Sequence, residues 1–413
     1  MEKLKFLTKE KAKEIVGKYG TPVFVYDQKT LEEQAQKVLN FPNAYGLTVR
    51  YAMKANPLKG ILSVFDNLGI HIDASSENEA YRAMMVGIPA ENIMLTSQEL
   101  PKRIKDVIDR GVYFNACSLN QLEEFGKAFP GRELSIRINP GLGSGGVNRT
   151  NVGGPSASFG IWHEQVDEVF NLVEKYALHV KKIHTHIGSG SDPEVWEKVA
   201  SMSLKYVEMF KEVETLNLGG GFKVARMENE ESINLENVGQ NIKKTFEDFY
   251  NKTQRKIHLE IEPGTFLMAN SGSLISTIKD IVSTGEGGFE FLKLDTGMDS
   301  ILRPSLYGAQ HPLITLSAET QSKDYVVVGH CCESGDILTP KSGDPEELDT
   351  RKLPQVSKGD LMVIEGVGAY CSSMNAKNYN SFLSPNEVLI DSDGMLSLIK
   401  KKQTLEQVME NEI

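Results

Sequence analysis

Lys54 is the residue whose type and place in the sequence best suit covalent chemistry. β-Branched and aromatic residues run from Leu47 to Tyr51, and Asn56-Pro57 follows, so we expect Lys54 at the exit of a strand because proline disfavours a continuing helix. A lysine amine that is removed from water loses its proton more easily and can then attack a carbonyl group to form a Schiff base. The simpler interpretation is an exposed lysine at a strand end.

Two glycine-containing turns could hold a phosphate group. Gly219, Gly220 and Gly221 directly follow the segment TLNL, and backbone amides without side chains could approach a phosphate there, although the same glycines could simply form a tight turn. The segment HIGSGSD at 186–192 adds the hydroxyl of Ser189 and two more glycines at the end of the preceding strand. Two adjacent strand ends of this kind favour phosphate binding.

Glu262 and a pair of histidines could act on a ring-shaped ligand. In the motif EIEPG, Glu262 could accept a hydrogen bond from a protonated ring nitrogen and keep that ring cationic, which would make the ring an electron sink. The alternative is a capping or salt-bridged glutamate. His184 and His186 are two residues apart on an expected strand, so they point to the same side. One could stack on a ring, whereas zinc binding is disfavoured because further ligands at informative spacing are missing.

Eight short apolar segments alternate with amphipathic helical segments between residues 48 and 265. They are 48–56, 71–76, 92–97, 112–118, 134–140, 182–189, 215–221 and 258–264. Eight strand–helix units predict an α/β fold with a (β/α)8 barrel, whose active site lies at the carboxyl ends of the strands. The following polar residues and glycines lie at or just past those ends: Lys54, Asp73, Ser97, Asn115, Asn139, His186, Gly219, Gly220, Gly221 and Glu262.

Beyond Gly264 the pattern changes to β-rich segments without long helices between them, which predicts a mostly antiparallel second domain. We expect the barrel to span residues 28–280 and the β-rich C-terminal domain to span residues 281–413. Residues 1–27 are expected to contribute to the second domain, because TPVFVYD within them has the composition of a strand. The glycine-rich stretch 141–160 is interpreted as a mobile loop beside the barrel mouth or as a flexible spacer.

Composition limits the classes of partner. The chain has 413 residues, which exceeds the roughly 250–300 at which one core stops growing, so two domains are expected. A net charge of −11 and the lack of a basic tract disfavour binding to nucleic acid. The sequence also lacks the long apolar run that a membrane segment or a signal peptide would need. We therefore expect a cytoplasmic protein that binds small molecules. No metal is expected, because four cysteines lack zinc-site spacing: Cys117, Cys331, Cys332 and Cys371.

Nine motifs, in order, resemble those of the barrel-type pyridoxal-phosphate-dependent decarboxylases, which have an alanine-racemase-like fold. They are YAMKAN, HIDASS, RINPG, THIGSGSD, LNLGGGF, EIEPG, RPSLYGAQHP, HCCESGDIL and GAYCSSMNAKNYNS, and the likeness as a whole covers about residues 20–395. Within the family, the resemblance is strongest to the enzymes that convert meso-2,6-diaminopimelate to L-lysine and carbon dioxide in bacterial lysine synthesis. The resemblance therefore implies this activity, an amino-acid substrate and pyridoxal 5′-phosphate as cofactor.

The same resemblance implies which residues contact the cofactor. Lys54 would carry it as a Schiff base, His186 would stack on the face of its ring, and Glu262 would pair with the ring nitrogen. The other cofactor-binding residues would be Asp73, Ser189, Gly219, Gly220, Gly221, Gly264, Thr265 and Tyr370.

The resemblance also implies a homodimer with shared active sites, in which Cys332 and Glu333 enter the site of the other subunit. The substrate would contact Arg303, Tyr307, Glu333 and Tyr370. Arg303 could bind the far carboxylate with two hydrogen bonds. Cys332 would return a proton to the carbanion left by decarboxylation, because a thiol with a pKa of about 8.5 is protonated at neutral pH. Cys331 is taken as a small buried hydrophobic residue.

The chain departs from the family at two positions. Thr265 stands where the family usually has an arginine after Glu-Pro-Gly, and Phe382 stands where an arginine commonly follows NYNS. A positive charge near the phosphate or the substrate carboxylate is therefore missing. Arg137, Arg149 and Arg303 are the candidates to replace it.

Alternative activities stay open. A related decarboxylase acting on ornithine, arginine, D-lysine or a carboxy-polyamine is one, although a cationic far end would favour an acid where Arg303 stands. A regulator without catalysis is disfavoured by the intact Lys54, Glu262 and glycine turn. A racemase is also disfavoured, because by resemblance such enzymes place an arginine against the ring nitrogen, whereas EIEPG supplies a carboxylate.

Overall fold

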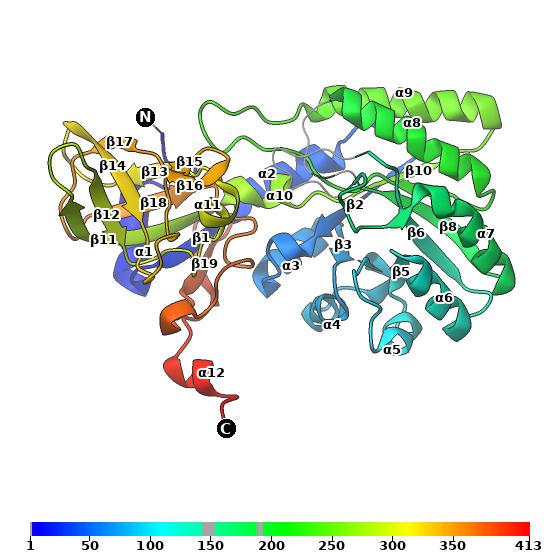
Figure 1. Cartoon of the computed structure of the whole chain (residues 1–413), viewed down its shortest axis with the longest axis horizontal. Coiled ribbons are helices and arrows are strands. Elements are labelled where there is room, and N and C mark those ends of the chain that lie inside the picture. The colour runs from blue at the N-terminus through cyan, green and yellow to red at the C-terminus, as the bar shows by residue number, and fades with distance from the viewer. Residues whose placement is uncertain (1, 143–152, 187, 189–192) are drawn as a thin grey trace. The chain divides into compact units, whose positions relative to one another are not determined.

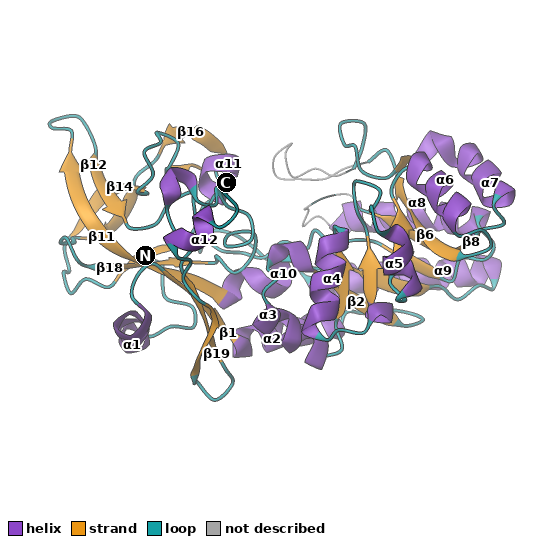
Figure 2. Ribbon diagram, turned by 90° about the horizontal axis from the view of Figure 1, so that it is seen from below, coloured by secondary structure: helices purple, strands orange, loops and turns teal. Residues whose placement is uncertain are grey.

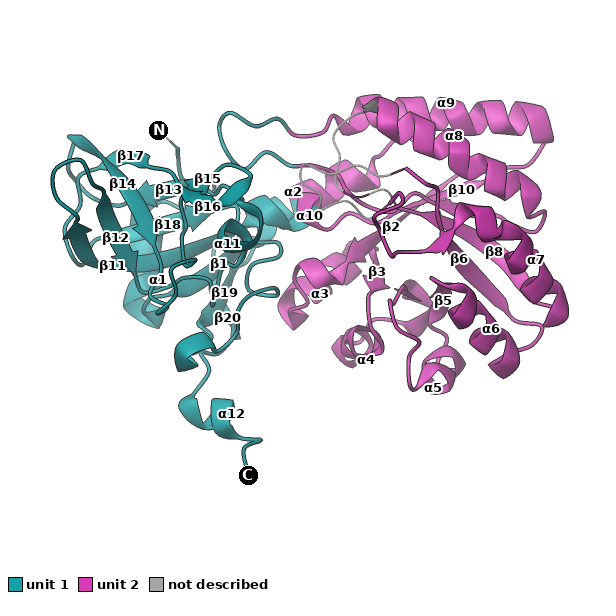
Figure 3. Cartoon of the chain, viewed as in Figure 1, with its two compact units in different colours: residues 1–32, 224–231, 267–413 teal, residues 33–223, 232–266 magenta. Residues whose placement is uncertain are grey.

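The structure is a computed structural model that describes residues 2–142, 153–186, 188 and 193–413. Its chain divides into two compact units (Figure 3). The barrel unit comprises residues 33–223 and 232–266, and the β unit comprises residues 1–32, 224–231 and 267–413. The domain limits expected from the sequence, 28–280 for the barrel and 281–413 for the β-rich domain, stay a prediction.

Eight parallel strands close into the barrel (Figure 1). They are β2 (Leu47–Ala52), β3 (His71–Ala74), β4 (Ile93–Leu95), β5 (Tyr113–Ala116), β6 (Glu133–Asn139), β8 (His179–Thr185), β9 (Thr215–Asn217) and β10 (His258–Ile261). Closure comes from the parallel pairing of β5 with β6 and of β10 with β2, while the short β7 (Ile161–Trp162) pairs with β6. The predicted (β/α)8 barrel is therefore confirmed, strand for strand.

Helices alternate with these strands, as the apolar spacing predicted (Figure 2). They are α2 (Gln28–Leu39), α3 (Lys59–Asn67), α4 (Glu77–Val86), α5 (Ile104–Asp109), α6 (Leu119–Ala128), α7 (Val166–Lys175), α8 (Pro193–Met209), α9 (Leu235–Thr253) and α10 (Thr265–Met268). Serine caps begin two of them, since the hydroxyls of Ser76 and Ser118 accept hydrogen bonds from backbone N–H groups of α4 and α6. Among the described helices, none is long and apolar enough to cross a membrane.

The β unit is built on one large sheet. Its strands are β1 (Val23–Asp27), β11 (Gly272–Ser283), β12 (Glu290–Leu294), β13 (Leu313–Thr315), β14 (Ser322–Val328), β17 (Arg351–Pro354), β18 (Leu361–Glu365), β19 (Asn386–Ile390) and β20 (Leu396–Lys400). Neighbours are antiparallel except for β1 with β19 and β12 with β14. A separate hairpin, β15 (Pro340–Lys341) and β16 (Asp344–Leu348), and the helices α1 (Lys9–Tyr19), α11 (Arg303–Tyr307) and α12 (Leu405–Met409) complete the unit.

The N-terminal segment belongs to this sheet. β1 pairs with β11 on one side and with β19 on the other, so it lies inside the sheet rather than at its edge. Val23 and Val25 of β1 are fully buried and pack in one hydrophobic cluster with Ile15 of α1 and Ile275 of β11. The strand predicted near Thr21 thus supplies part of the core of the β unit.

A buried ion network stabilises the barrel interior. Arg50 of β2 donates two hydrogen bonds of 3.1 Å to the two carboxylate oxygens of Glu260 on β10, whose side chain is only 2% exposed. Lys182 of β8 donates a third, at 2.5 Å. Although burial opposes ionisation, the attraction of Arg50 and Lys182 lowers the pKa of Glu260 to about 2. The carboxylate of Glu260 is therefore held between two cations.

Replacing Glu260 by glutamine should destabilise the fold by about 3–5 kcal/mol, because two buried cations would lose their carboxylate. Urea unfolding of the two proteins, followed by circular dichroism, would measure the difference. The control is Glu347→Gln, which breaks the exposed pair with Lys341 and should leave stability nearly unchanged. Equal stabilities of wild type and Glu260→Gln would contradict a stabilising role for the network.

Candidate active site

Lys54 lies where the sequence predicted it, just past the end of a barrel strand. It is the middle residue of a single 3₁₀ turn, Met53–Ala55, that follows β2 directly, and its two neighbours in that turn are buried. The hydroxyl of Tyr51 donates a hydrogen bond of 3.0 Å to the carbonyl oxygen of Asn56 and so fixes the path of the chain around the turn. The Lys54 side chain is exposed, so the chain itself does not supply the desolvation that activates an amine.

Two carboxyl groups are buried at the same end of the barrel. Asp73 is in β3 and is 3% exposed, while Glu262 follows β10 and is 7% exposed. Burial raises the pKa of both groups, and the nearby Asp73 raises the pKa of Glu262 further, to about 8. Lys54 and Arg137 act in the opposite direction on both acids. The four residues therefore form one electrostatic cluster in the barrel unit.

Glu262 is held by residues from three further strands. Asn217, the last residue of β9, donates a hydrogen bond of 2.6 Å to one carboxyl oxygen, and the Nε2 atom of His184 lies 3.4 Å from the other. The amide of Asn115 donates to His184 Nδ1 at 2.7 Å, so the proton of the neutral imidazole is on Nε2 and faces Glu262. The backbone N–H of Glu262 donates a hydrogen bond of 2.8 Å to the carbonyl oxygen of Gly219.

The glycines after β9 permit close packing between strand ends. Gly219 has a φ of +71°, and a Cβ atom there would overlap the ring of His186. A Cβ atom on Gly220 would overlap the carbonyl oxygen of Glu262. The N–H of Gly220 donates to His186 Nδ1 at 3.2 Å, and burial holds the pKa of His186 well below its usual value, so the ring is neutral. The tight turn is thus observed, and phosphate binding by Gly219, Gly220 and Gly221 stays a prediction.

These residues fit the cofactor that the sequence resemblance implies. Two buried polar atoms at this end of the barrel have no hydrogen-bond partner: Asp73 Oδ1 and Asn115 Oδ1. Unpaired buried polar atoms are unfavourable unless a ligand satisfies them. A buried carboxyl group with a raised pKa favours a ligand that carries a cationic N–H, because a nearby positive charge restores the carboxylate form. The Lys54 amine adds a group that can bind an aldehyde.

Other residues predicted at the rim have different or undescribed positions. Ser189 lies outside the described residues, as do Arg149 and the rest of 143–152 in the glycine-rich loop. The side chain of Asn139 binds the backbone on either side of that loop, since its Oδ1 atom accepts hydrogen bonds from the N–H of Gly141 at 3.2 Å and of Gly154 at 2.9 Å. Gly264 is buried, and Thr265 is half-buried at the start of α10.

In the β unit, two predicted substrate residues share one short helix. Arg303 begins α11 and Tyr307 ends it, and the guanidinium carbon lies 5.9 Å from the centre of the tyrosine ring. Tyr370 follows β18 and has a φ of +56°, a left-handed conformation that costs of order 1 kcal/mol for a residue other than glycine. Strain of this kind at a predicted contact residue favours a functional role for Tyr370.

Cys332 and Glu333 are both exposed on the β unit. The backbone N–H of Cys332 donates to Asn380 Oδ1 at 2.7 Å, and the hydroxyl of Tyr379 donates to Glu333 Oε2 at 3.3 Å. The loop of the NYNS motif therefore supports the CESGD motif directly. Asn380 holds its contact with a φ of +50°, another left-handed residue.

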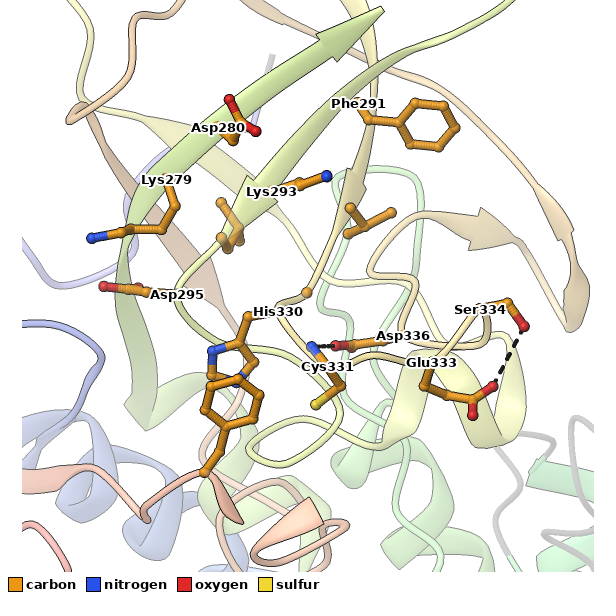
Figure 4. Close-up of a pocket in the computed structure, with 14 residues that line it drawn as sticks. Lys279, Asp280, Phe291, Lys293, Asp295, His330, Cys331, Glu333, Ser334 and Asp336 are labelled. Atoms are coloured by element: carbon orange, nitrogen blue, oxygen red, sulfur yellow. Dashed lines mark hydrogen bonds between the residues drawn. The ribbon is translucent and has the colours of Figure 1, made fainter. Parts of the chain in front are cut away.

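A pocket of about 660 Å³ lies wholly within the β unit, beside the CESGD motif (Figure 4). Phe382 lines it and stacks on the ring of His330, with 3.5 Å between ring centres and 8° between planes. Cys331 also lines the pocket and is half-buried, which corrects the expectation of a fully buried residue. The ligand atoms of Asp299, His330 and Cys331 lie within 4.8 Å of one another, the one trio in the described part of the chain that could hold a metal ion.

Sequence reasoning missed the residues that position Glu262. Asn217 was not singled out, although its place at the carboxyl end of a barrel strand, two residues before Gly219, was an available signal. Arg137 was considered only as a replacement for a missing substrate-binding arginine. The structure instead places it among the buried acids, where it lowers the pKa of Asp73 and of Glu262.

Comparisons with known proteins give one family model and relatives of nearly the same length. Residues 29–269 match the family model of the pyridoxal-binding domain of pyridoxal-dependent decarboxylases. Diaminopimelate decarboxylase from Escherichia coli is 32% identical over 98% of this chain and 97% of its own length. A crystal structure of a diaminopimelate decarboxylase has a TM-score of 0.91 at 32% identity, covering 98% of this chain and 97% of its own. The Helicobacter pylori enzyme complexed with L-lysine has a TM-score of 0.84 at 27% identity, with 97% and 98% covered.

Replacing Glu262 by glutamine should flatten the pH dependence of stability in the cofactor-free protein. Folding raises the pKa of Glu262 from 4.5 to about 8, so the folded state keeps a proton that the unfolded state has lost, and stability falls as pH rises between these values. One such group contributes a slope of up to about 1.4 kcal/mol per pH unit. Chemical denaturation at several pH values would measure the slope.

The matched control is Glu365→Gln in the β unit. Glu365 is also buried, and burial raises its pKa to about 6, so its removal should flatten the curve only below that pH. If wild type and Glu262→Gln lose stability equally between pH values of about 6 and 8, the carboxyl group of Glu262 does not titrate as the structure indicates.

Proposed function

Because this chain belongs to the family of pyridoxal-dependent decarboxylases, we propose that it converts meso-2,6-diaminopimelate to L-lysine and carbon dioxide. Its cofactor is pyridoxal 5′-phosphate. The observation that carries the proposal is the buried acid pair Asp73 and Glu262 at the barrel end where Lys54 lies. Nearly full-length similarity to diaminopimelate decarboxylases supports the choice of substrate over other amino acids.

Residues of the barrel unit would hold the cofactor and set its charge. When bound, pyridoxal phosphate supplies an electron sink for the electron pair that remains after carbon dioxide leaves. Lys54 would bind the cofactor through its side-chain amine, and Glu262 would hold a proton at the ring nitrogen. Asn217 and His184 keep the carboxyl group of Glu262 in place. The ring of His186 would pack against the ring of the cofactor.

The phosphate group would be bound by backbone and hydroxyl groups. We assign this role to Ser189, Gly219, Gly220, Gly221, Gly264 and Thr265. Positive φ angles at Gly219 and Gly221 support the assignment, because glycine backbones can approach an anion without side-chain obstruction.

Residues of the β unit would complete the site in a homodimer. Cys332 is the proposed acid that returns a proton to the substrate carbon, and Glu333 and Tyr370 contact the substrate. Exposure of Cys332 and Glu333 supports a role at a subunit interface, since an exposed thiol and carboxylate are available to a second copy of the chain. We further propose that the enzyme works in the cytoplasm.

Arg303 and Tyr307 would recognise the far end of the substrate. A guanidinium group there favours a far carboxylate, because the two can form paired charge-assisted hydrogen bonds. The alternative is a related decarboxylase for ornithine, arginine, D-lysine or a carboxy-polyamine. Thr265 is the observation that favours this alternative, since it lacks the charge of the arginine usual in the family.

Replacing Lys54 by alanine should abolish carbon dioxide release from meso-2,6-diaminopimelate, because the amine that binds the cofactor is removed. The visible absorbance of the purified protein should disappear as well. Lys59→Ala is the control, since Lys59 is an exposed lysine at the start of α3, five positions later in the chain. Retained turnover in Lys54→Ala would remove Lys54 from the site.

Mixing two inactive variants tests the shared site. If Cys332 acts in the other subunit, combining Lys54→Ala with Cys332→Ala should restore roughly one quarter of wild-type activity, because random exchange makes half of the dimers mixed and each has one intact site. Activity is measured after subunit exchange in dilute denaturant. A mixture of Lys54→Ala with Cys331→Ala serves as control, and no gain from the Cys332 mixture would show that each subunit uses its own thiol.

A further inference from the structure

Arg226 is held in a defined position in the β unit by contacts along its stem. Its Nε atom donates a hydrogen bond of 3.0 Å to the carbonyl oxygen of Gly366, and its aliphatic carbons lie against that glycine. Its backbone N–H donates at 2.7 Å to the carboxylate of Glu230, which also accepts from the N–H of Met227. The backbone is therefore fixed independently of what the far end of the guanidinium group binds.

The far end of this guanidinium lacks a partner. Arg226 Nη2 is buried and has no hydrogen-bond acceptor, and the same is true of Arg303 Nε on α11. Neither arginine forms an ion pair among the residues that the structure describes. Burial lowers the pKa of Arg226 to about 9, and the charge of Arg303 is the second cause, so the two cations lie close to each other.

Glu230 is close enough to raise the pKa of Arg226, but it accepts hydrogen bonds from backbone N–H groups and not from the guanidinium. His311 is buried, and its Nδ1 atom donates to the carbonyl oxygen of Glu365 at 3.0 Å, so the neutral ring leaves Nε2 unprotonated and without a partner. Both arginines lower the pKa of His311 further after burial. Two cations with buried N–H donors that lack partners are unfavourable together unless an anion binds them. The arrangement therefore points to a carboxylate ligand.

We propose that Arg226 acts with Arg303 to bind the far carboxylate of the substrate, and so offsets the loss of charge in a chain that has Thr265 where the family usually has arginine. The inference rests on the proposed dicarboxylic substrate. Of the other replacements considered from the sequence, Arg137 lies among the acids of the barrel unit, and Arg149 is outside the described residues. Arg226 had no sequence signal, because it lies in an irregular stretch after the glycine turn.

Binding of the product distinguishes recognition of the far carboxylate by Arg226 from a purely structural role of this residue. Decarboxylation removes the carboxyl group at the reacting carbon, so L-lysine keeps the far carboxylate, whereas cadaverine lacks it. Arg226→Gln should weaken L-lysine binding to the holoenzyme about 10- to 100-fold, as expected for loss of a charge-assisted hydrogen bond, and leave cadaverine binding unchanged. Isothermal titration calorimetry measures both. The KM for meso-2,6-diaminopimelate should rise by a similar factor while kcat changes little.

Two further variants make the test specific. Arg226→Lys keeps a charge but loses the planar fork, so it should bind L-lysine with an intermediate affinity, and it carries the test if Arg226→Gln does not fold. Arg351→Gln is the matched control, because Arg351 is another arginine of the β unit with buried nitrogens that lack partners. Its replacement should change the affinity for neither L-lysine nor cadaverine.

The outcomes distinguish this inference from the proposed activity. Unchanged L-lysine binding in folded Arg226→Gln or Arg226→Lys overturns the inference, and so does an equal loss of L-lysine and cadaverine, which would mean a structural role. If the wild-type enzyme releases no carbon dioxide from meso-2,6-diaminopimelate, the proposed function is wrong. The calorimetric comparison of L-lysine with cadaverine still decides whether Arg226 binds a carboxylate.

Discussion

The buried carboxyl group of Glu262 is the feature on which the site depends. Its removal from water and its closeness to Asp73 make the ionised form unfavourable, so a cationic group nearby is stabilised in return. The backbone around it is built for this position. Gly220 lacks a Cβ atom where the carbonyl oxygen of Glu262 lies, and Asn217 and Gly219 supply a hydrogen-bond donor and an acceptor from the adjacent turn.

Glu260 in β10 and Glu262 just after that strand show how strongly the surroundings of a glutamate decide its chemistry. Glu260 and Glu262 are two positions apart, and both are buried, yet the pKa of the first is lowered to about 2 and that of the second is raised to about 8. Glu260 faces Arg50 and Lys182, which satisfy its charge within the protein. Glu262 faces Asp73 instead, and its charge is left for a ligand. The first carboxyl group is satisfied within the protein, and the second is available to a ligand.

The two units leave opposite charges open. The barrel unit buries acids, which suit a cationic ring nitrogen, whereas the β unit buries unpaired N–H groups of Arg226 and Arg303, which suit a carboxylate. Both arrangements are unfavourable in the chain by itself and become favourable with a ligand of matching charge. Left-handed backbone at Tyr370 and Asn380 adds strain in the β unit. An amino-acid decarboxylase needs such unsatisfied groups, because its cofactor and substrate carry both charges.

The sequence by itself determined the barrel and the ends of its strands, because apolar periodicity and the polar, glycine or proline residues after each strand are local properties of the chain. It therefore placed Lys54 and Glu262 correctly at strand ends. Only the tertiary structure decided which polar groups meet. Asn217 binds Glu262, and Arg226 interacts with Arg303, although both partners are distant in the chain. The half-buried position of Cys331 was likewise set by packing. Periodicity shows which face of a strand is buried, but not what lies opposite it.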